Sequence, residues 1–138
     1  MYLNKVMLIG HLGRDTETHT TQNNSRMMSF TLATTEVWRD RDTGERREKT
    51  EWHRIVVFNE HLMETVERFL RKGSKAYVEG QLNTRKWTDK EGQEHSTTEI
   101  VVNNYKGNVL ALDRQEQNGQ HDRQERIVRR TANDGIPF

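Results

Sequence analysis

The sequence predicts an all-β domain that contains one α-helix and is followed by a disordered tail. Most of residues 1–112 alternates between apolar and polar side chains, which is the pattern of half-buried strands. One segment, 59–72, instead has apolar residues at spacings of three and four, which is typical of a helix. From Asp113 onward no periodic apolar pattern remains. We therefore expect a folded domain over 1–112 and a disordered tail over 113–138.

Composition and charge argue against several classes of protein. The 138 residues include no Cys, which leaves no disulfide, thiol nucleophile or thiolate metal site. Met1 leads directly into a strand-like run, and no apolar run is long enough to span a membrane, so we expect a soluble cytoplasmic protein with no membrane partner. The 22 basic and 21 acidic side chains nearly cancel. A nucleic-acid binder with this balance must sort its charges onto separate surfaces.

The first part of the chain predicts two strands separated by a loop. The apolar run Asn4–Leu12 predicts a buried strand, and Gly10 and Gly13 predict a bend and a turn at its end. The polar segment Thr16–Ser25 predicts a surface loop. A second strand is then expected over Met27–Trp38.

Alternation in this second strand places Met28, Phe30 and Leu32 on the core face. Trp38 has the same parity, so it points to the core unless the strand bulges or runs past the end of the core. The sequence leaves both orientations open. The next segment, Arg39–Lys49, holds five basic and four acidic residues around a Thr-Gly pair and predicts a charged hairpin loop.

The segment Thr50–Phe58 predicts a third strand with an unusual face. Trp52, Arg54 and Phe58 share one side, whereas Ile55 lies on the other side as a core candidate. Aromatic rings can stack on nucleic-acid bases, and a guanidinium can contact phosphates. The alternative is that Trp52 and Phe58 are ordinary core residues.

The segment Asn59–Lys72 predicts the helix. Asn59 is a suitable N-cap, and Gly73 supplies the C-terminal stop. The expected core-facing stripe consists of Leu62, Met63, Val66, Phe69 and Leu70.

A long hairpin and a closing strand follow the helix. The fourth strand begins at Lys75–Leu82, with Leu82 inward, and continues to Thr88. It turns at Asp89–Gln93 and returns through Thr97–Asn103. Residues Asn108–Leu112 close the domain. Five strands with one helix between the third and fourth is the element order of an OB-fold barrel, whose faces and loops bind oligonucleotides.

The three tryptophans have similar surroundings. Each is expected where a strand meets a polar or charged stretch, within two residues of a basic side chain. The repeated pairing favours base stacking over core packing and predicts sequence-tolerant, salt-sensitive binding. The pairs are Trp38 with Arg39, Trp52 with Arg54, and Trp87 with Arg85 and Lys86.

The sequence carries no pattern that indicates catalysis. The six histidines show no spacing typical of a metal site, and no Gly-rich phosphate loop occurs. The acidic residues lie among basic neighbours on expected loops and helix faces. We therefore expect no enzymatic activity, no metal and no cofactor.

Several long motifs carry a family resemblance. They are Gly10-x-Leu12-Gly13, Thr50-Glu51-Trp52-His53, Leu70-Arg71-Lys72-Gly73-Ser74, Tyr77-Val78-Glu79-Gly80-Gln81-Leu82 and Thr84-Arg85-Lys86-Trp87-Thr88-Asp89. With these motifs the chain resembles the bacterial single-stranded DNA-binding protein (SSB) family over about Leu3–Leu112, and again at its last four residues.

The resemblance implies an OB-fold homotetramer around which single-stranded DNA wraps, in the bacterial cytoplasm and associated with the nucleoid. It places His53 at the subunit interface, although a hydrogen bond within one subunit is an alternative role. By position it assigns base stacking to Trp38, Trp52, Phe58 and Trp87, and phosphate contacts to Lys5, Arg39, Arg54, Lys72, Arg85 and Lys86.

In this family the C-terminal tip recruits replication, recombination and repair proteins. The tip of this chain keeps the apolar end but only one acidic side chain, with Arg129-Arg130 upstream, so partner binding through it is expected to be weaker or more selective. Two other functions stay open at this stage: an oligomeric OB-fold interaction module and an RNA-binding OB domain. The tip residues are Asp134, Gly135, Ile136, Pro137 and Phe138.

Overall fold

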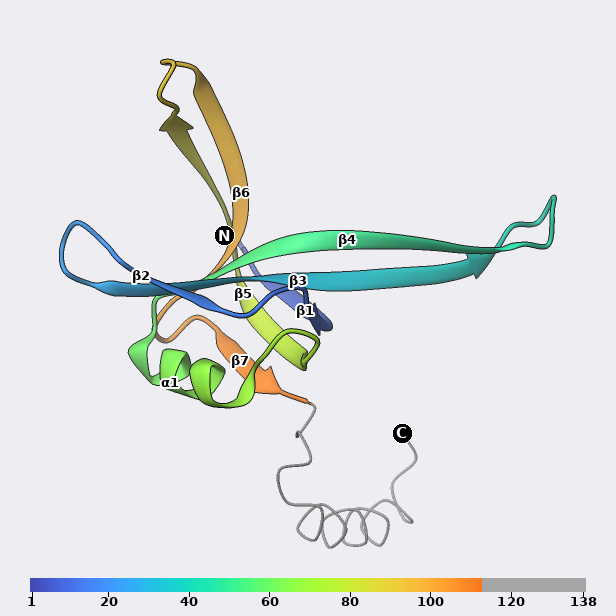
Figure 1. Cartoon of the computed structure of the whole chain (residues 1–138), viewed down its shortest axis with the longest axis horizontal. Helices are drawn as coiled ribbons and strands as arrows, with labels where there is room; N and C mark the ends of the chain where they lie inside the picture. The colour runs from blue at the N-terminus through green and yellow to red at the C-terminus, as the bar shows by residue number, and fades with distance from the viewer. Residues whose placement is uncertain (113–138) are drawn as a thin grey trace, which may run out of the picture.

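Five strands close into a barrel, and one helix covers one end of it (Figure 1). The structure is a computed structural model that describes residues 1–112, so the expected tail and its tip lie outside the described residues. The elements are β1 (Val6–Leu12), β2 (Glu17–Thr20), β3 (Arg26–Arg39), β4 (Arg46–Val57), α1 (Glu60–Phe69), β5 (Lys75–Thr88), β6 (Glu94–Val102) and β7 (Asn108–Ala111).

The barrel strands follow the order β1-β3-β4-β6-β5, and pairing of β1 with β5 closes the ring. Only β4 and β6 run parallel to each other; the other pairs are antiparallel. The short strands β2 and β7 extend the sheet by pairing with β3 and β5. The predicted OB-fold barrel, with a helix between its third and fourth strands, is confirmed.

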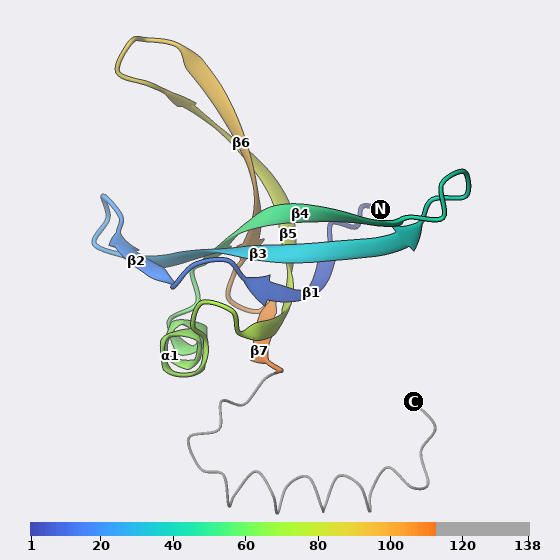
Figure 2. The ribbon, with the colours of Figure 1, turned by 45° about the vertical axis from the view of Figure 1, so that its right-hand side comes forward.

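Alternate side chains of the barrel strands fill the interior. Met28, Phe30 and Leu32 are buried as predicted, and they pack with Ile55 and Val78 in a single cluster. Buried side chains of α1 join this cluster, and Figure 2 shows the helix lying across one end of the barrel. Burial of this continuous apolar cluster is the main stabilisation of the fold.

The helix begins as predicted and ends early. The Asn59 side-chain oxygen accepts hydrogen bonds from the backbone of His61 and Leu62, which confirms the N-cap. The backbone becomes extended at Leu70, and Gly73 adopts a φ of +86°. The helix was predicted to reach Lys72 with Phe69 in the core, which is wrong, because the chain leaves the helix at Leu70 and Phe69 is half exposed.

Three other expectations need correction. The expected loop Thr16–Ser25 contains β2, which pairs along β3. The first strand is not buried throughout, because Met7 and Ile9 point outward and are exposed. Leu82 has the inward parity of β5 but is half exposed, since β5 has by then run past the core.

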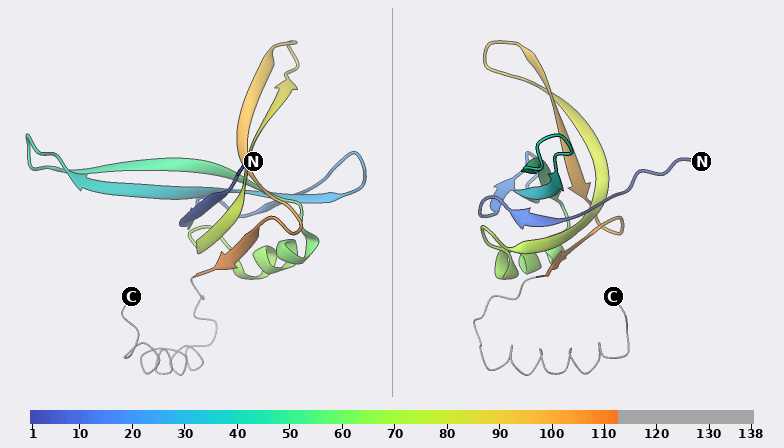
Figure 3. Two further views of the ribbon diagram at one scale, coloured as in Figure 1. Left: turned by 180° about the vertical axis from the view of Figure 1, so that it is seen from behind. Right: turned by 90° about the vertical axis from the view of Figure 1, so that its right-hand side faces the viewer.

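Two hairpins, β3–β4 and β5–β6, extend well beyond the barrel and project in different directions (Figure 3). In the first hairpin the pairing is unbroken from Met28 with Val57 to Arg39 with Arg46. Within the expected charged loop Arg39–Lys49, residues 40–45 form the turn, whereas Arg39 and residues 46–49 belong to the two strands. Since the register has no bulge, Trp38 is exposed because its strand outruns the core.

Candidate nucleic-acid interface

Strands β4, β6 and β5 are neighbours in the barrel, where β4 pairs with β6 over residues 55–57 and β6 pairs with β5. Ile55 pairs with Ile100, and both point into the core. The alternation of side chains therefore turns Arg54 of β4 and Glu99 of β6 outward. The same alternation places Arg85 of β5 on this outer face, which we call the β4–β6–β5 face.

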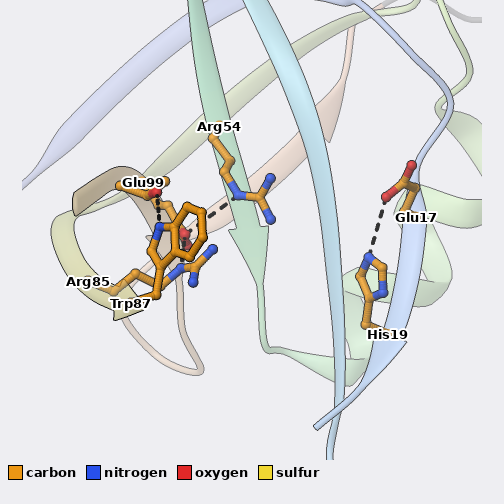
Figure 4. Close-up of polar contacts among 7 residues, drawn as sticks. Glu17, His19, Arg54, Arg85, Trp87 and Glu99 are labelled. Atoms are coloured by element: carbon orange, nitrogen blue, oxygen red, sulfur yellow. Dashed lines mark hydrogen bonds and ion pairs between the residues drawn. The ribbon is translucent and has the colours of Figure 1, made fainter. Parts of the chain in front are cut away.

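Glu99 lies at the centre of the β4–β6–β5 face. Its Oε1 is 3.5 Å from Nε of Arg54 and is also contacted by Nε of Arg85. Figure 4 shows both contacts meeting at the Glu99 carboxylate. Glu99 is 4% exposed, whereas both arginines are partly open to solvent. A buried carboxylate needs such partners, because an unpaired buried charge is strongly destabilising.

Trp87 stands beside this ion-pair cluster with its indole fixed by two neighbours. Its Nε1 donates a hydrogen bond of 2.8 Å to Oγ1 of Thr97. Its ring stacks on His95, with centroids 4.5 Å apart and an interplanar angle of 25°. Because Trp87 is still 41% exposed, the indole keeps surface available to a further planar ring.

His95 is in turn held by Asp89 at the tip of the β5–β6 hairpin. His95 Nε2 lies 2.7 Å from Asp89 Oδ2, and Oδ1 of Asp89 accepts hydrogen bonds from the backbone of Glu91 and Gln93. The hydrogen bond from His95 is the main cause of a lowered Asp89 pKa, and the backbone donors add to it. One carboxylate thus connects the turn to the residue on which Trp87 stacks.

The pKa of Asp89 gives a first testable prediction. Replacing His95 by alanine should raise this pKa toward its ordinary value of 3.8, because the largest stabiliser of the carboxylate is gone. A lowered pKa means that the ionised Asp89 stabilises the tip above pH 3.8 and that this stabilisation fades as the pH falls through the lowered pKa. A ¹³C NMR titration of the Asp89 carboxyl carbon in wild type and variant measures the shift. His61→Ala on the distant helix serves as control, and an unchanged Asp89 titration in His95→Ala would refute the assignment.

Trp52 lies on the same outer side of the sheet, two residues before Arg54 on β4. It is 59% exposed, which excludes the alternative of a core residue. Gly13, just past β1, lies beneath its ring: a Cβ at this glycine would stand 2.2 Å from Cζ3 of Trp52. The absence of a side chain at Gly13 therefore allows the indole its position.

Two of the expected DNA-contacting residues face the other way. In the β3–β4 hairpin Trp38 pairs with Arg47, so it has the parity of Leu32 and lies on the ribbon face opposite Trp52. In the β5–β6 hairpin Lys86 pairs with Ser96 and points away from the side that carries Arg85 and Trp87. Trp38 is nevertheless 46% exposed, so a ligand can reach its ring on the ribbon face opposite Trp52.

The remaining expected residues are spread around the barrel. Phe58 directly follows β4, is 39% exposed, and donates its backbone N–H to the carbonyl of Val102. Lys72 lies in the turn before β5, where its backbone N–H is bound by Asp15. Arg39 ends β3 near the hairpin tip.

Lys5 precedes β1 and forms an ion pair of 3.1 Å with Glu79 in the first half of β5, away from Trp87. This lysine is the main cause of a lowered Glu79 pKa. The structure therefore does not bring Lys5 to the β4–β6–β5 face beside Trp87.

His53 lies in β4 with a half-buried side chain. Its Nε2 is 2.8 Å from Oγ1 of Thr34 on the neighbouring strand, so the alternative hydrogen bond within one chain is present. The expected role of His53 at a subunit interface stays a prediction.

Sequence reasoning missed three residues of this site. Glu99 and His95 are brought to Arg54 and Trp87 by strand pairing, and only the outward parity of β6 could have indicated them. Arg14 lines a small hollow together with Arg54 and Asp15, next to the Gly13–Trp52 contact. Arg14 lies just past the first expected strand, where the sequence has no alternating pattern that predicts the direction of a side chain.

Residues 1–112 show neither a membrane-spanning helix nor a metal-binding cluster. No helix in this part of the chain has the length and apolarity needed to cross a membrane. In the same part, no group of three or more His, Asp or Glu side chains is arranged to hold a metal ion.

The chain is similar in sequence to known proteins. Residues 3–107 match the model of the single-strand binding protein family. The single-stranded DNA-binding protein of Rickettsia conorii is 51% identical over 119 residues, which cover 86% of this chain and 78% of that protein. That of Rhizobium meliloti is 50% identical over 111 residues, 80% of this chain and 64% of that protein.

The chain is also similar in its fold to a solved structure. The Plasmodium falciparum SSB, in a complex with single-stranded DNA, is 42% identical and superposes with a TM-score of 0.73 over 82% of this chain and 97% of that chain. Sequence and structure point to one relationship: the chain belongs to the single-strand binding protein family.

Proposed function

We propose that the chain binds single-stranded DNA without sequence preference and that bases stack on the β4–β6–β5 face. The observation that carries this proposal is the pair of exposed indoles, Trp52 and Trp87, on one face with Arg54 and Arg85. Indole rings stack on any base, and guanidinium groups contact the phosphates. The family relationship and the DNA-bound relative support the same ligand.

Binding extends beyond this face to a second set of residues. Trp38 lies on the opposite side of the β3–β4 ribbon, so one strand of DNA that stacks on both Trp52 and Trp38 must pass around the ribbon. This geometry favours wrapping over a straight path. The further proposed contacts are Phe58 for stacking and Lys5, Arg39, Lys72 and Lys86 for phosphates.

The wrapped unit is a homotetramer in this proposal. Ile9, Tyr77 and Leu110 form a row across β1, β5 and β7, outside the barrel, and Ile9 and Leu110 are half exposed. Such an apolar row is a suitable surface for a second copy of the chain. His53 is assigned to the interface on the family resemblance alone. Light scattering at several concentrations should give the mass of four chains.

The cellular role follows from the ligand. By coating exposed strands the protein would protect single-stranded DNA in replication, recombination and repair, acting in the bacterial cytoplasm at the nucleoid as a binding protein and not as an enzyme. Its tip, Asp134–Phe138, would recruit partner enzymes of these processes. The tip lies outside the described residues, so this role rests on its sequence.

The proposal is tested by competition among nucleic acids. Fluorescence anisotropy of labelled oligo(dT), competed by unlabelled oligo(dT), oligo(U) and duplex DNA of equal length, ranks the ligands. We expect oligo(dT) to compete best and its affinity to fall with added salt. Equal competition by oligo(U) would favour an RNA-binding domain. No binding by an intact oligomer would favour a protein-interaction module.

Gly13 offers a conservative test of the Trp52 position. Gly13→Ala should leave the fold intact, because the nearest atom is the far end of a side chain, and displace the indole. Affinity for oligo(dT) should then fall about fivefold, a part of the ~1–3 kcal/mol of one base stack. The same substitution in a Trp52→Ala background should cause no further loss. Equal losses in both backgrounds would show that Gly13 acts independently of Trp52.

A further inference from the structure

The two arginines of the β4–β6–β5 face share one buried partner. Arg54 comes from β4 and Arg85 from β5, and β6 with Glu99 runs between these strands. Within residues 1–112 each guanidinium contacts the carboxylate through Nε alone. The two terminal amino groups of each arginine are thus left for a ligand. An arginine presents its donors as a rigid fork, so fixing Nε also fixes where these amino groups point.

The position of Glu99 is unexpected for a face that binds a polyanion. A carboxylate at its centre repels phosphates, and its side chain is only 5% exposed, so solvent screens it little. Exposed acidic residues elsewhere on the hairpins are screened by solvent, so they repel phosphates much less. The contact of Glu99 with two guanidinium groups offsets this repulsion if it places both groups where they bind phosphates.

We propose that Glu99 is a positioning residue that holds Arg54 and Arg85 as a paired clamp for the phosphodiester groups of single-stranded DNA. This inference rests on the proposed function. The carboxylate accepts a hydrogen bond from Nε of Arg85 and forms an ion pair with Nε of Arg54. The four remaining amino groups face the DNA backbone between the bases stacked on Trp52 and Trp87. The charge of Glu99 is tolerated because it organises two positive charges.

Glu99→Gln separates positioning from simple charge. Both arginines contact the one oxygen Oε1. Glutamine has nearly the same shape and keeps one such oxygen but carries no charge, so it should hold the two guanidinium groups more weakly than the carboxylate does. We expect affinity for oligo(dT) to fall about tenfold, the effect of one charge-assisted hydrogen bond, although a negative charge has been removed. The slope of log affinity against log salt should become shallower by about one, because fewer phosphates are neutralised.

Glu94→Gln is the matched control. It removes the same charge from the same strand, but Glu94 is exposed and pairs with Thr88 on the opposite side of the ribbon. Its affinity should equal that of the wild type or be slightly higher. In an Arg54→Ala, Arg85→Ala background, Glu99→Gln should no longer weaken binding.

A second variant keeps the test decisive if Glu99→Gln fails to fold. Arg85→Lys keeps the positive charge but has no fork, so it cannot reach Glu99 and a phosphate together, and it should bind about tenfold more weakly. Wild-type affinity in Arg85→Lys, or tighter binding in a folded Glu99→Gln, would overturn the clamp while leaving the proposed function intact. Failure of the wild type to bind oligo(dT) would instead overturn the proposed function.

Discussion

Replacing Trp52 and Trp87 together by alanine is expected to weaken oligo(dT) binding by about 2–6 kcal/mol, a loss of at least about thirtyfold in affinity. Both indoles are exposed on the β4–β6–β5 face, and neither belongs to the buried cluster. The fold should therefore survive the change. Anisotropy of a labelled oligo(dT) measures the loss without relying on the fluorescence of the removed residues.

The matched control for this double variant is Phe69→Ala. Phe69 is also exposed and also lies beside a cation, with the Arg68 guanidinium carbon 5.6 Å from its ring centroid, but it belongs to the helix at the end of the barrel. Its loss should not change affinity. Unchanged binding by a folded Trp52→Ala, Trp87→Ala protein would place the DNA on another surface.

Gly10→Ala is expected to give the largest loss of stability, about 2–3 kcal/mol, with a fall in Tm on the order of 10 °C. β1 pairs with β5 from Val6 to His11 and with β3 over His11 and Leu12, so Gly10 lies next to the residue at which the barrel closes. A Cβ there would lie 2.1 Å from the carbonyl oxygen of Ala33. Since the obstacle is backbone, one strand must move and the closure is strained.

Gly44→Ala is the comparison for thermal unfolding. Gly44 has a φ of +70° at the hairpin tip, and nothing lies within 4 Å of a Cβ placed there. Its replacement costs only the unfavourable backbone conformation, about 1–2 kcal/mol. If Gly10→Ala unfolds at a temperature no lower than Gly44→Ala, the close approach of β1 to β3 is not essential to the barrel.

The sequence predicted the barrel well because side-chain parity is a local property. Met28, Phe30 and Leu32 alternate with polar residues, and one face of their strand is buried as that pattern requires. Parity also put Trp52 and Arg54 on one face, and their pairing with Ala33 and Thr31 of β3 keeps them there. The N-cap at Asn59 was predictable for the same reason, since a cap depends on its immediate neighbours.

What the sequence could not provide depends on contacts between distant segments. Parity alone left two orientations for Trp38, because the length of a strand relative to the core is a property of the whole barrel. The contact of Glu99 with Arg54 exists because β4 and β6 pair in parallel, and no local pattern predicts that pairing. β2 was missed because a short polar strand at an edge carries no apolar alternation.

Tryptophan emission during titration with oligo(dT) shows whether bases stack on the exposed indoles. We expect strong quenching that saturates at a fixed ratio of nucleotides to chain and is reversed by added salt, because bases cover the exposed indoles and phosphates hold the strand. Binding that leaves the emission unchanged would contradict it, since Trp52 and Trp87 would then lie away from the bound bases.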